Sequence, residues 1–324
     1  VKHGAGPEMS PLPLSVSLHP CPHPQATVGP VSERILTLRV GGCGVSGFLL
    51  GAWNAQGLAV CFAVCAATSY VRGGHSEAAR HYLCSSKGLA LLVASGIVSG
   101  VGSGCWTLSF QHTSVEQAYL FNSFHPTLII LCRLLALQPV LTGEGVGLLL
   151  GLAGAALTAS TPDPAHESKL FGDACAFCSS VSLCFYLLAS KRVRPHVPLT
   201  TMLTIVCLFS ALTQSAMAWA AGPRLTIDRH PVNGIFGYLD PTYRRWWALM
   251  LLVTAVGQGG YIGALKSLPP VVVSICMTAE PVLAVFIQNA ISALVGRDPE
   301  WPTAVGVVGG LLIIVGSVVV SYVS

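Results

Sequence analysis

Long apolar segments that are nearly free of charge dominate this 324-residue sequence. A membrane-spanning helix needs about 20 mostly apolar residues, because it must cross a hydrocarbon layer of about 30 Å. Nine segments have this character, and they lie near residues 45–68, 88–109, 115–137, 145–160, 170–190, 199–221, 246–265, 270–294 and 302–322. A bilayer core requires every backbone polar group to be paired internally, which helices achieve within one segment. The sequence therefore predicts an all-α, polytopic integral membrane protein with nine visible helices.

The scarcity of charge supports this prediction. Charged residues make up 9% of the chain and hydrophobic residues 52%, whereas soluble domains carry roughly 25% charged residues. The net charge of +4 is small and dispersed, so no nucleic-acid partner is expected. The 12 cysteines show no metal or disulfide pattern, and several lie inside apolar segments as small hydrophobic side chains. We expect the lipid bilayer as surroundings, no metal and no cofactor.

An internal repeat is the most informative pattern. A shift of 155 residues, the separation of Pro126 and Pro281, aligns residues 101–154 with residues 256–309 without a gap. The same shift matches several other positions, namely Val101-Gly102 with Val256-Gly257, Gly104 with Gly259, Leu128 with Leu283, Gly151 with Gly306 and Gly154 with Gly309. Prolines and glycines that match at several points in one register indicate duplication of one helical unit.

The repeat also divides the chain. Residues 45–160 form a first unit with four predicted helices, and residues 170–322 form a second unit with five. The helix at 170–190 maps onto a stretch within residues 1–40, which is rich in Pro, His and Ser and is predicted to be disordered. The first helix of the first unit is therefore not recognisable in the sequence. A unit of five helices places its successor in the membrane with the opposite orientation, which is a recurring plan of secondary transporters.

Basic residues near the helix ends favour one orientation. One side of the predicted topology receives Arg72, Arg80, Lys87, Lys191, Arg192, Arg194 and Lys266. Cytosolic loops carry an excess of Lys and Arg, so this side is predicted to face the cytosol. The long linker 222–245 lies on the other side and carries four arginines of its own.

Several short segments follow one another in a characteristic order, namely Gly172-Asp173, Ser190-Lys191-Arg192, Tyr261 to Leu265, Leu268-Pro269-Pro270, Ala279 to Ala284, and Gly306 to Gly316, with His125 to Leu128 and Gly143-Glu144 in the first half. Through these segments the chain resembles the EamA-type branch of the drug/metabolite transporter superfamily. The resemblance implies ten helices, two inverted five-helix repeats and a central substrate path. This sequence departs from the family pattern in lacking a recognisable first helix and in having Gly296-Arg297-Asp298 at a turn that is usually Gly-Glu.

The matched prolines point to a candidate substrate path. Pro126 and Pro281 lie inside apolar segments, where proline frees a backbone carbonyl that needs another partner or a cavity. Broken helices at equivalent positions of two repeats are a sequence indicator of a transporter's site; a plain structural kink is the alternative. The polar residues in register with them are Tyr119 and Ser123 in the first half and Ser274 and Thr278 in the second. These could equally bond across packed helices.

Further candidates follow from the same register. His125 and Glu280 are equivalent, precede the prolines, and are ionisable groups at membrane depth, which are functional candidates by default. Proton coupling and a plain inter-helix hydrogen bond both fit them. Trp106 is equivalent to Tyr261, and Gln258 lies beside Tyr261; an aromatic next to a polar group suits an organic solute, although aromatic packing is the simpler explanation.

Three functions fit this pattern. The first is secondary-active transport of a small organic solute or metabolite by alternating access, with a homodimer as a candidate assembly. The second is an intramembrane enzyme, but the sequence contains no HExxH, GxSxG or Walker-type motif, so we expect no enzymatic activity. The third is a truncated membrane protein of the same fold that does not transport.

Overall fold

The computed structural model describes residues 46–73, 77–113, 115–159, 170–221, 225–230, 232–277 and 304–323, and the statements below concern these residues. They form almost only helices, which are α2 (Gly47–Gly73), α3 (Glu77–Cys84), α4 (Ser86–His112), α5 (Val115–Asn122), α6 (His125–Leu135), α7 (Thr142–Ala159), α8 (Leu170–Val193), α9 (Leu199–Ala220), the 3-10 turn η2 (Gly237–Leu239), α10 (Pro241–Ala264), α11 (Pro270–Met277) and α13 (Ala304–Val323). Five of them, α2, α4, α8, α9 and α10, are long and apolar enough to cross a membrane. The chain is a polytopic helical membrane protein, as predicted.

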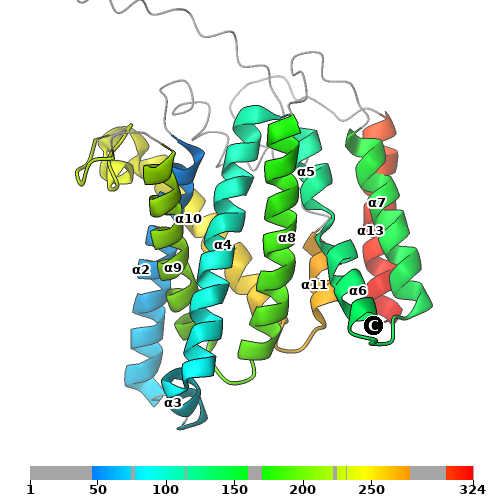
Figure 1. Cartoon of the computed structure of the whole chain (residues 1–324), viewed down its shortest axis with the longest axis horizontal. Helices are drawn as coiled ribbons and strands as arrows, with labels where there is room; N and C mark the ends of the chain where they lie inside the picture. The colour runs from blue at the N-terminus through cyan, green and yellow to red at the C-terminus, as the bar shows by residue number, and fades with distance from the viewer. Residues whose placement is uncertain are drawn as a thin grey trace, which may run out of the picture.

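Equivalent helices of the two halves run in opposite directions (Figure 1). The 155-residue shift places α5 on α11 with identical bounds. It also pairs α2 with α9, α4 with α10 and α7 with α13. In each pair one helix ascends in Figure 1 and the other descends, as the path from α6 into α7 and the C-terminal end of α13 make visible. The inverted arrangement is therefore seen in four helix pairs; the segment equivalent to α8 lies outside the described residues.

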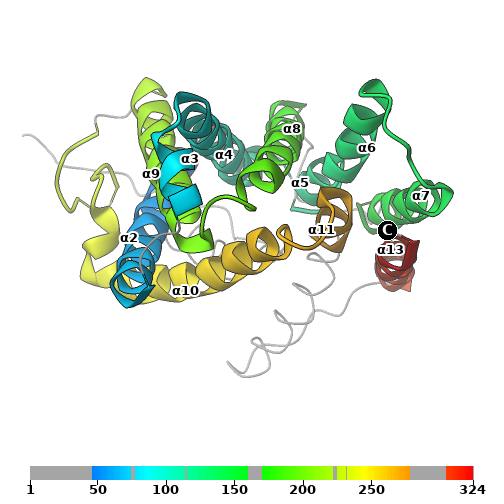
Figure 2. The same ribbon diagram turned by 90° about the horizontal axis from the view of Figure 1, so that it is seen from below.

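Helix α10 faces a row of three long helices across the bundle (Figure 2). Seen from below, α9, α4 and α8 stand in a row, and α10 lies opposite them, with α2 at one end and α11 at the other (Figure 2). Small residues hold the row together: a side chain at Gly96 or Gly100 of α4 would meet α9 within 3 Å, and one at Gly102 would meet Ser182 of α8 at 2.8 Å. Small residues permit this close packing in lipid, where the hydrophobic effect between helices is weak.

The pair α7 and α13 packs even more closely. A Cβ atom on Gly154 would lie 2.4 Å from the carbonyl oxygen of Gly309, and one on Gly147 would lie 2.6 Å from that of Gly316. Gly154 and Gly309 are equivalent under the repeat. The two halves thus touch backbone to backbone at one matched position.

The predicted helix 115–137 is two helices, because the chain turns at Ser123 and Phe124. Pro126 lies in the first turn of α6, where its missing N–H needs no helical partner. Helix α11 ends at Met277, the equivalent of Asn122 at the end of α5. The first predicted break is therefore confirmed; the second, at Pro281, lies outside the described residues.

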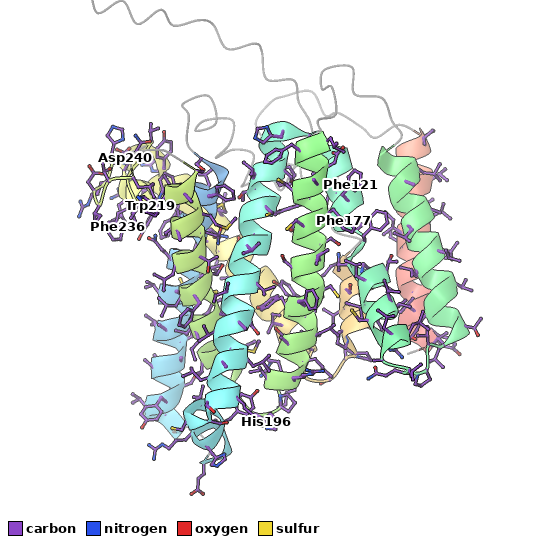
Figure 3. All side chains as sticks on the ribbon, in the orientation of Figure 1. Phe121, Phe177, His196, Trp219, Phe236 and Asp240 are labelled. Atoms are coloured by element: carbon purple, nitrogen blue, oxygen red, sulfur yellow. The ribbon has the colours of Figure 1, made fainter. Side chains whose placement is uncertain are left out.

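The connection between α9 and α10 lies at one end of the bundle. Trp219 and Phe236 lie at the upper end in Figure 3, near Asp240, and His196 lies at the lower end. At the upper end, residues 225–240 cover Trp53, whose indole N–H donates to the carbonyl of Gly234 (3.0 Å). In this exposed segment, hydrogen bonds from Thr226 and from the His230 backbone N–H lower the pKa of the Asp228 carboxyl.

Polar contacts anchor both ends of α8. At its start, Thr113 of the α4 end donates to the Asp173 carboxylate (2.6 Å). At its end, Lys191 donates to the carbonyls of Leu265 and Leu268 (2.9 Å each), and Arg194 donates to that of Ile262 (3.2 Å). Cations near a helix C-terminus are favourable because they pair with unsatisfied carbonyls. The end of α8 therefore caps the end of α10.

Candidate functional site

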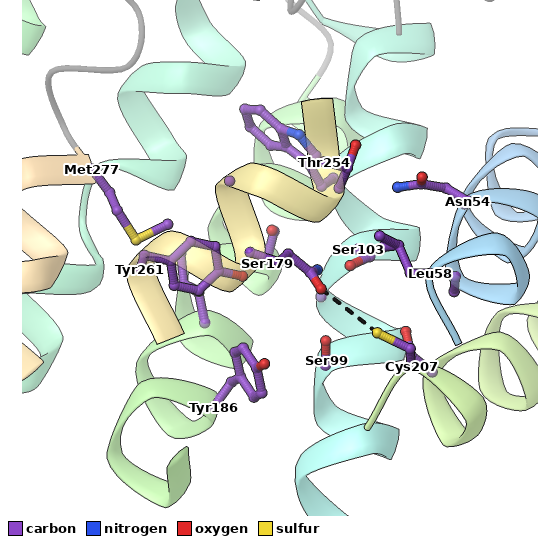
Figure 4. A pocket seen from close by; sticks show the side chains of 18 of the residues that line it. Asn54, Leu58, Ser99, Ser103, Ser179, Tyr186, Cys207, Thr254, Tyr261 and Met277 are labelled. Carbon is purple, nitrogen blue, oxygen red and sulfur yellow. Dashed lines mark hydrogen bonds between the residues drawn. The ribbon is translucent and has the colours of Figure 1, made fainter. Parts of the chain in front are cut away.

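A cavity of about 760 Å³ occupies the centre of the bundle (Figure 4). Its walls come from α2, α4, α8, α9, α10 and α11, with Asn122 contributing from the end of α5. Small-molecule sites commonly measure about 300–1,000 Å³ and are mostly apolar with a few polar groups. This cavity has both the size and the mixed lining of such a site.

Equivalent positions of α4 and α10 line the cavity from both halves of the repeat. They are Ser99 with Thr254, Gly102 with Gly257, Ser103 with Gln258, and Trp106 with Tyr261. These positions are separated by three, one and three residues, so on a helix they lie on one face. Helices α4 and α10 are equivalent and run in opposite directions. Each turns the same set of equivalent positions towards the cavity.

Polar side chains add to this lining. Asn54 of α2 points into the cavity (Figure 4), and Gln214 of α9 donates to the Ser210 hydroxyl (3.1 Å) while its amide oxygen lies directly over Gly51. The Cys207 thiol of α9 donates to the amide oxygen of Gln258 (3.6 Å), the contact drawn as a dashed line in Figure 4. The polar groups thus come from helices on facing walls.

Aromatic side chains also line the cavity. Trp106 packs edge-on against Phe110 and Tyr119, with ring centroids 4.4 and 5.1 Å apart. Tyr186 of α8 and Tyr261 of α10 lie close together on another part of the wall (Figure 4). Such rings bury large area and hold ligands in preferred orientations.

Three of the predicted site residues, Trp106, Gln258 and Tyr261, line the cavity. Tyr119 lies behind the wall against Trp106. Ser123, in the turn after α5, is buried and donates to the carbonyl of Tyr119 (2.7 Å). Pro126 is buried at the start of α6. These three positions belong to the packing around the helix break rather than to the cavity lining.

His125 bridges the break to α11. Its Nδ1 lies 2.6 Å from the carbonyl oxygen of Asn122, and its Nε2 lies 3.1 Å from the carbonyl oxygen of Ser274. Ser274 is fully buried. Both partners of the ring are acceptors, so a neutral imidazole can donate to one of them at a time. His125 thus makes the inter-helix hydrogen bond that was the alternative to proton coupling. The predicted residues Thr278, Glu280 and Pro281 lie outside the described residues.

Several lining residues were missed in the sequence, above all Asn54 and Gln214. Both are amides inside apolar segments, and polar residues at membrane depth are a usable signal by themselves. The prediction relied on residues matched by the repeat, and neither has a polar equivalent, since the shift pairs them with Phe209 and Ala59. Arg133, near the end of α6, forms an ion pair with Glu144 of α7 (2.7 Å).

Comparisons with known proteins agree with the fold. Residues 170–322 match the model of the EamA-like transporter family. Among solved structures, 28 chains match. One of them, titled only "Crystal structure of protein", has a TM-score of 0.60 at 18% identity and covers 90% of this chain and 95% of its own, so it is similar in fold. No curated protein matches.

The family match and the long apolar helices together identify an integral, multi-pass membrane protein of a transporter family. The match covers the second half of the chain, and the inverted helix pairs relate the first half to it. Residues 170–322 thus match the EamA-like transporter family, which belongs to the drug/metabolite transporter superfamily.

Proposed function

We propose that the chain is a secondary-active carrier that binds one small organic solute in the central cavity. The observation that carries the proposal is that four pairs of equivalent positions on α4 and α10 line one space. A site shared by two inverted repeats lies where each repeat can open it to one side of the membrane. Alternating access then follows from rocking one repeat against the other, with residues 45–160 and 170–322 as the two units.

The proposal gives the cavity residues separate tasks. Trp106 and Tyr261 contact the apolar surface of the solute, and Ser103 and Gln258 hydrogen-bond its polar groups. His125 keeps α6 fixed to α11 at the helix break, which holds the end of α5 beside the cavity. Glu280 stays a candidate for proton coupling, with an inter-helix hydrogen bond as the alternative.

The test is a solute screen on the purified full chain in detergent. A ligand that binds only the folded state raises the apparent melting temperature. Amino acids, amines, nucleobases, sugars and organic acids are tested at pH 5.5 and 7.5, and each stabilising solute is then assayed for uptake into proteoliposomes. One solute class is expected to stabilise the chain and to be transported.

Two matched variants locate the site. Ser103→Phe places a ring in the cavity, and Leu252→Phe adds a ring on the exposed face of α10, where Leu252 is 62% accessible. Binding and uptake are expected to vanish in Ser103→Phe and to persist in Leu252→Phe. A folded wild-type chain that binds and transports no solute class would contradict the carrier proposal.

A further inference from the structure

The cavity lining separates into two kinds of surface. Tyr186, Tyr261 and Met277 lie on one side in Figure 4, and Asn54, Ser103 and Cys207 lie on the other. The first group offers flat rings and a polarisable thioether, which pack against apolar ring faces. The second group offers amide, hydroxyl and thiol groups. A complementary ligand has an apolar face and a polar edge.

Several amide oxygens at the cavity have no hydrogen-bond partner among the described residues. They are the side-chain oxygens of Asn54, Asn122 and Gln214, and each is buried. Gln214 is 1% accessible. Leaving a buried acceptor without a partner is unfavourable, so these oxygens favour a ligand that supplies N–H or O–H donors. A primary amide also carries an NH₂ group, and can therefore pair with a donor and an acceptor that are adjacent on one edge.

The lining within the described residues contains no Asp, Glu, Lys, Arg or His. A charged solute in a water-poor cavity requires an opposite charge or a dense set of hydrogen bonds. The lining instead combines four aromatic rings, those of Trp106, Phe110, Tyr186 and Tyr261, with the amides of Asn54, Asn122, Gln214 and Gln258. Both features favour a ligand without net charge.

We propose that the cavity selects uncharged, flat heteroaromatic molecules with hydrogen-bonding groups on the ring edge, which is the chemistry of a free nucleobase. This inference rests on the proposed carrier function and narrows its substrate class. The ring stacks against Trp106, and its edge pairs with the amides of Gln214 and Asn54. Rings without a polar edge leave those amides unpaired, and sugars lack the flat face.

The test measures binding to the purified full chain in detergent at pH 7.5 by isothermal titration calorimetry. The probes are adenine, naphthalene, glucose and L-tryptophan, which are respectively flat with a polar edge, flat without one, polar without a flat face, and zwitterionic. Adenine is expected to bind at least tenfold more tightly than the other three. Trp106→Leu is expected to weaken adenine binding at least tenfold, since stacking on one aromatic ring is worth about 1–3 kcal/mol, and Gln214→Leu about fivefold.

Two controls make the result specific. Trp219→Leu removes an indole that is 73% accessible and does not line the cavity, so adenine affinity should not change. Trp106→Phe keeps a ring and should retain most of the affinity, which separates loss of stacking from loss of folding.

Each other outcome is decisive. If glucose or L-tryptophan binds best and Ser103→Phe abolishes that binding, the nucleobase-like class is wrong and the carrier proposal stands. If adenine binds equally to Trp106→Leu, it binds elsewhere and the class is also wrong. If no probe and no solute of the screen binds, both proposals fail together.

Discussion

Two helix pairs related by the same duplication have opposite packing. In the pair α7 and α13, equivalent glycines touch, and a Cβ atom on Gly154 would lie 2.4 Å from a backbone oxygen of Gly309. In the pair α4 and α10, equivalent positions line a cavity, and a Cβ atom on Gly257 would have no neighbour within 4 Å. One repeated unit therefore produces a tight contact at one place and an open site at another.

The comparison shows that the role of a glycine depends on what lies next to it. Glycine next to a neighbouring backbone permits close approach, whereas glycine beside a cavity leaves room for a ligand. A Gly→Ala change adds the same methyl group at both places. We expect it to reduce stability in the first and ligand affinity in the second.

The largest effect is expected at the α7–α13 contact. Gly154→Ala must separate two backbones, and forcing extra atoms into a packed contact typically costs about 1–3 kcal/mol, so the free energy of unfolding should fall by about 2 kcal/mol. Gly151→Ala is the matched control on α7, because its Cβ atom would have no neighbour within 4 Å. Urea or SDS unfolding of both variants measures the difference. Equal stabilities would mean that the close contact is not present in the membrane protein.

In the cavity, Gly51→Ala should weaken solute binding with little change in stability. Its Cβ atom would meet the amide oxygen of Gln214 at 1.8 Å, and the flexible amide can move away. We expect about a fivefold loss of affinity for the solute found in the screen and a melting temperature within about 2 °C of the wild type. Gly257→Ala, on the open wall, should also lower the affinity and leave the melting temperature unchanged, because its methyl group would take up space left for the ligand. A large loss of stability in Gly51→Ala would place this glycine in the packed class instead.

The cap on the end of α10 tests whether hydrogen bonds or positive charge alone stabilise that end of the helix. Lys191→Met removes two hydrogen bonds from an ammonium group to carbonyls of the chain after α10. Because Lys191 is only partly buried, we expect a loss of about 1 kcal/mol in unfolding free energy. The adjacent Arg192, which is exposed, serves as the control, and Arg192→Met should be neutral. If both variants behave alike, the general loss of positive charge, and not the cap, determines the effect.

The last prediction is a gain in stability. Leu137, after α6, has a φ of 55°, in the left-handed region that favours glycine. Leu137→Gly should therefore raise the unfolding free energy by about 1 kcal/mol, while Ala136→Gly, at a φ of −84°, should lower it. A destabilised Leu137→Gly variant would indicate that the exposed leucine contributes contacts with lipid.

Much of the fold was readable from the sequence, because apolar length and the repeat are properties of the chain alone. The break before Pro126 and the equivalence of α4 and α10 both followed from residue type and register. The site was readable only in part. Trp106, Gln258 and Tyr261 line the cavity, but Tyr119 and Ser123 belong to the packing beside the break. Which face of a short helix meets a cavity depends on how far its neighbours stand apart, and side-chain spacing does not encode that distance.

Asn54 and Gln214 line the cavity, but the search for matched residues did not find them. Each lies on a helix whose equivalent carries an apolar residue at that position. Duplication explains the matched walls of the cavity, whereas these two polar groups each belong to one half alone. A search for matched residues therefore finds the walls of the site and overlooks part of its chemistry.

The most direct test asks whether equivalent positions of α4 and α10 line one binding site. Ser103→Cys and Thr254→Cys are introduced separately, and thiol labelling is followed by mass spectrometry with increasing concentrations of the transported solute. Native Cys65, which is exposed on α2 and does not line the cavity, is the internal control. We predict that the solute protects both introduced thiols with the same half-saturation concentration and leaves Cys65 labelling unchanged. Protection of only one position, or of neither at saturating solute, would contradict a shared site between the two inverted units.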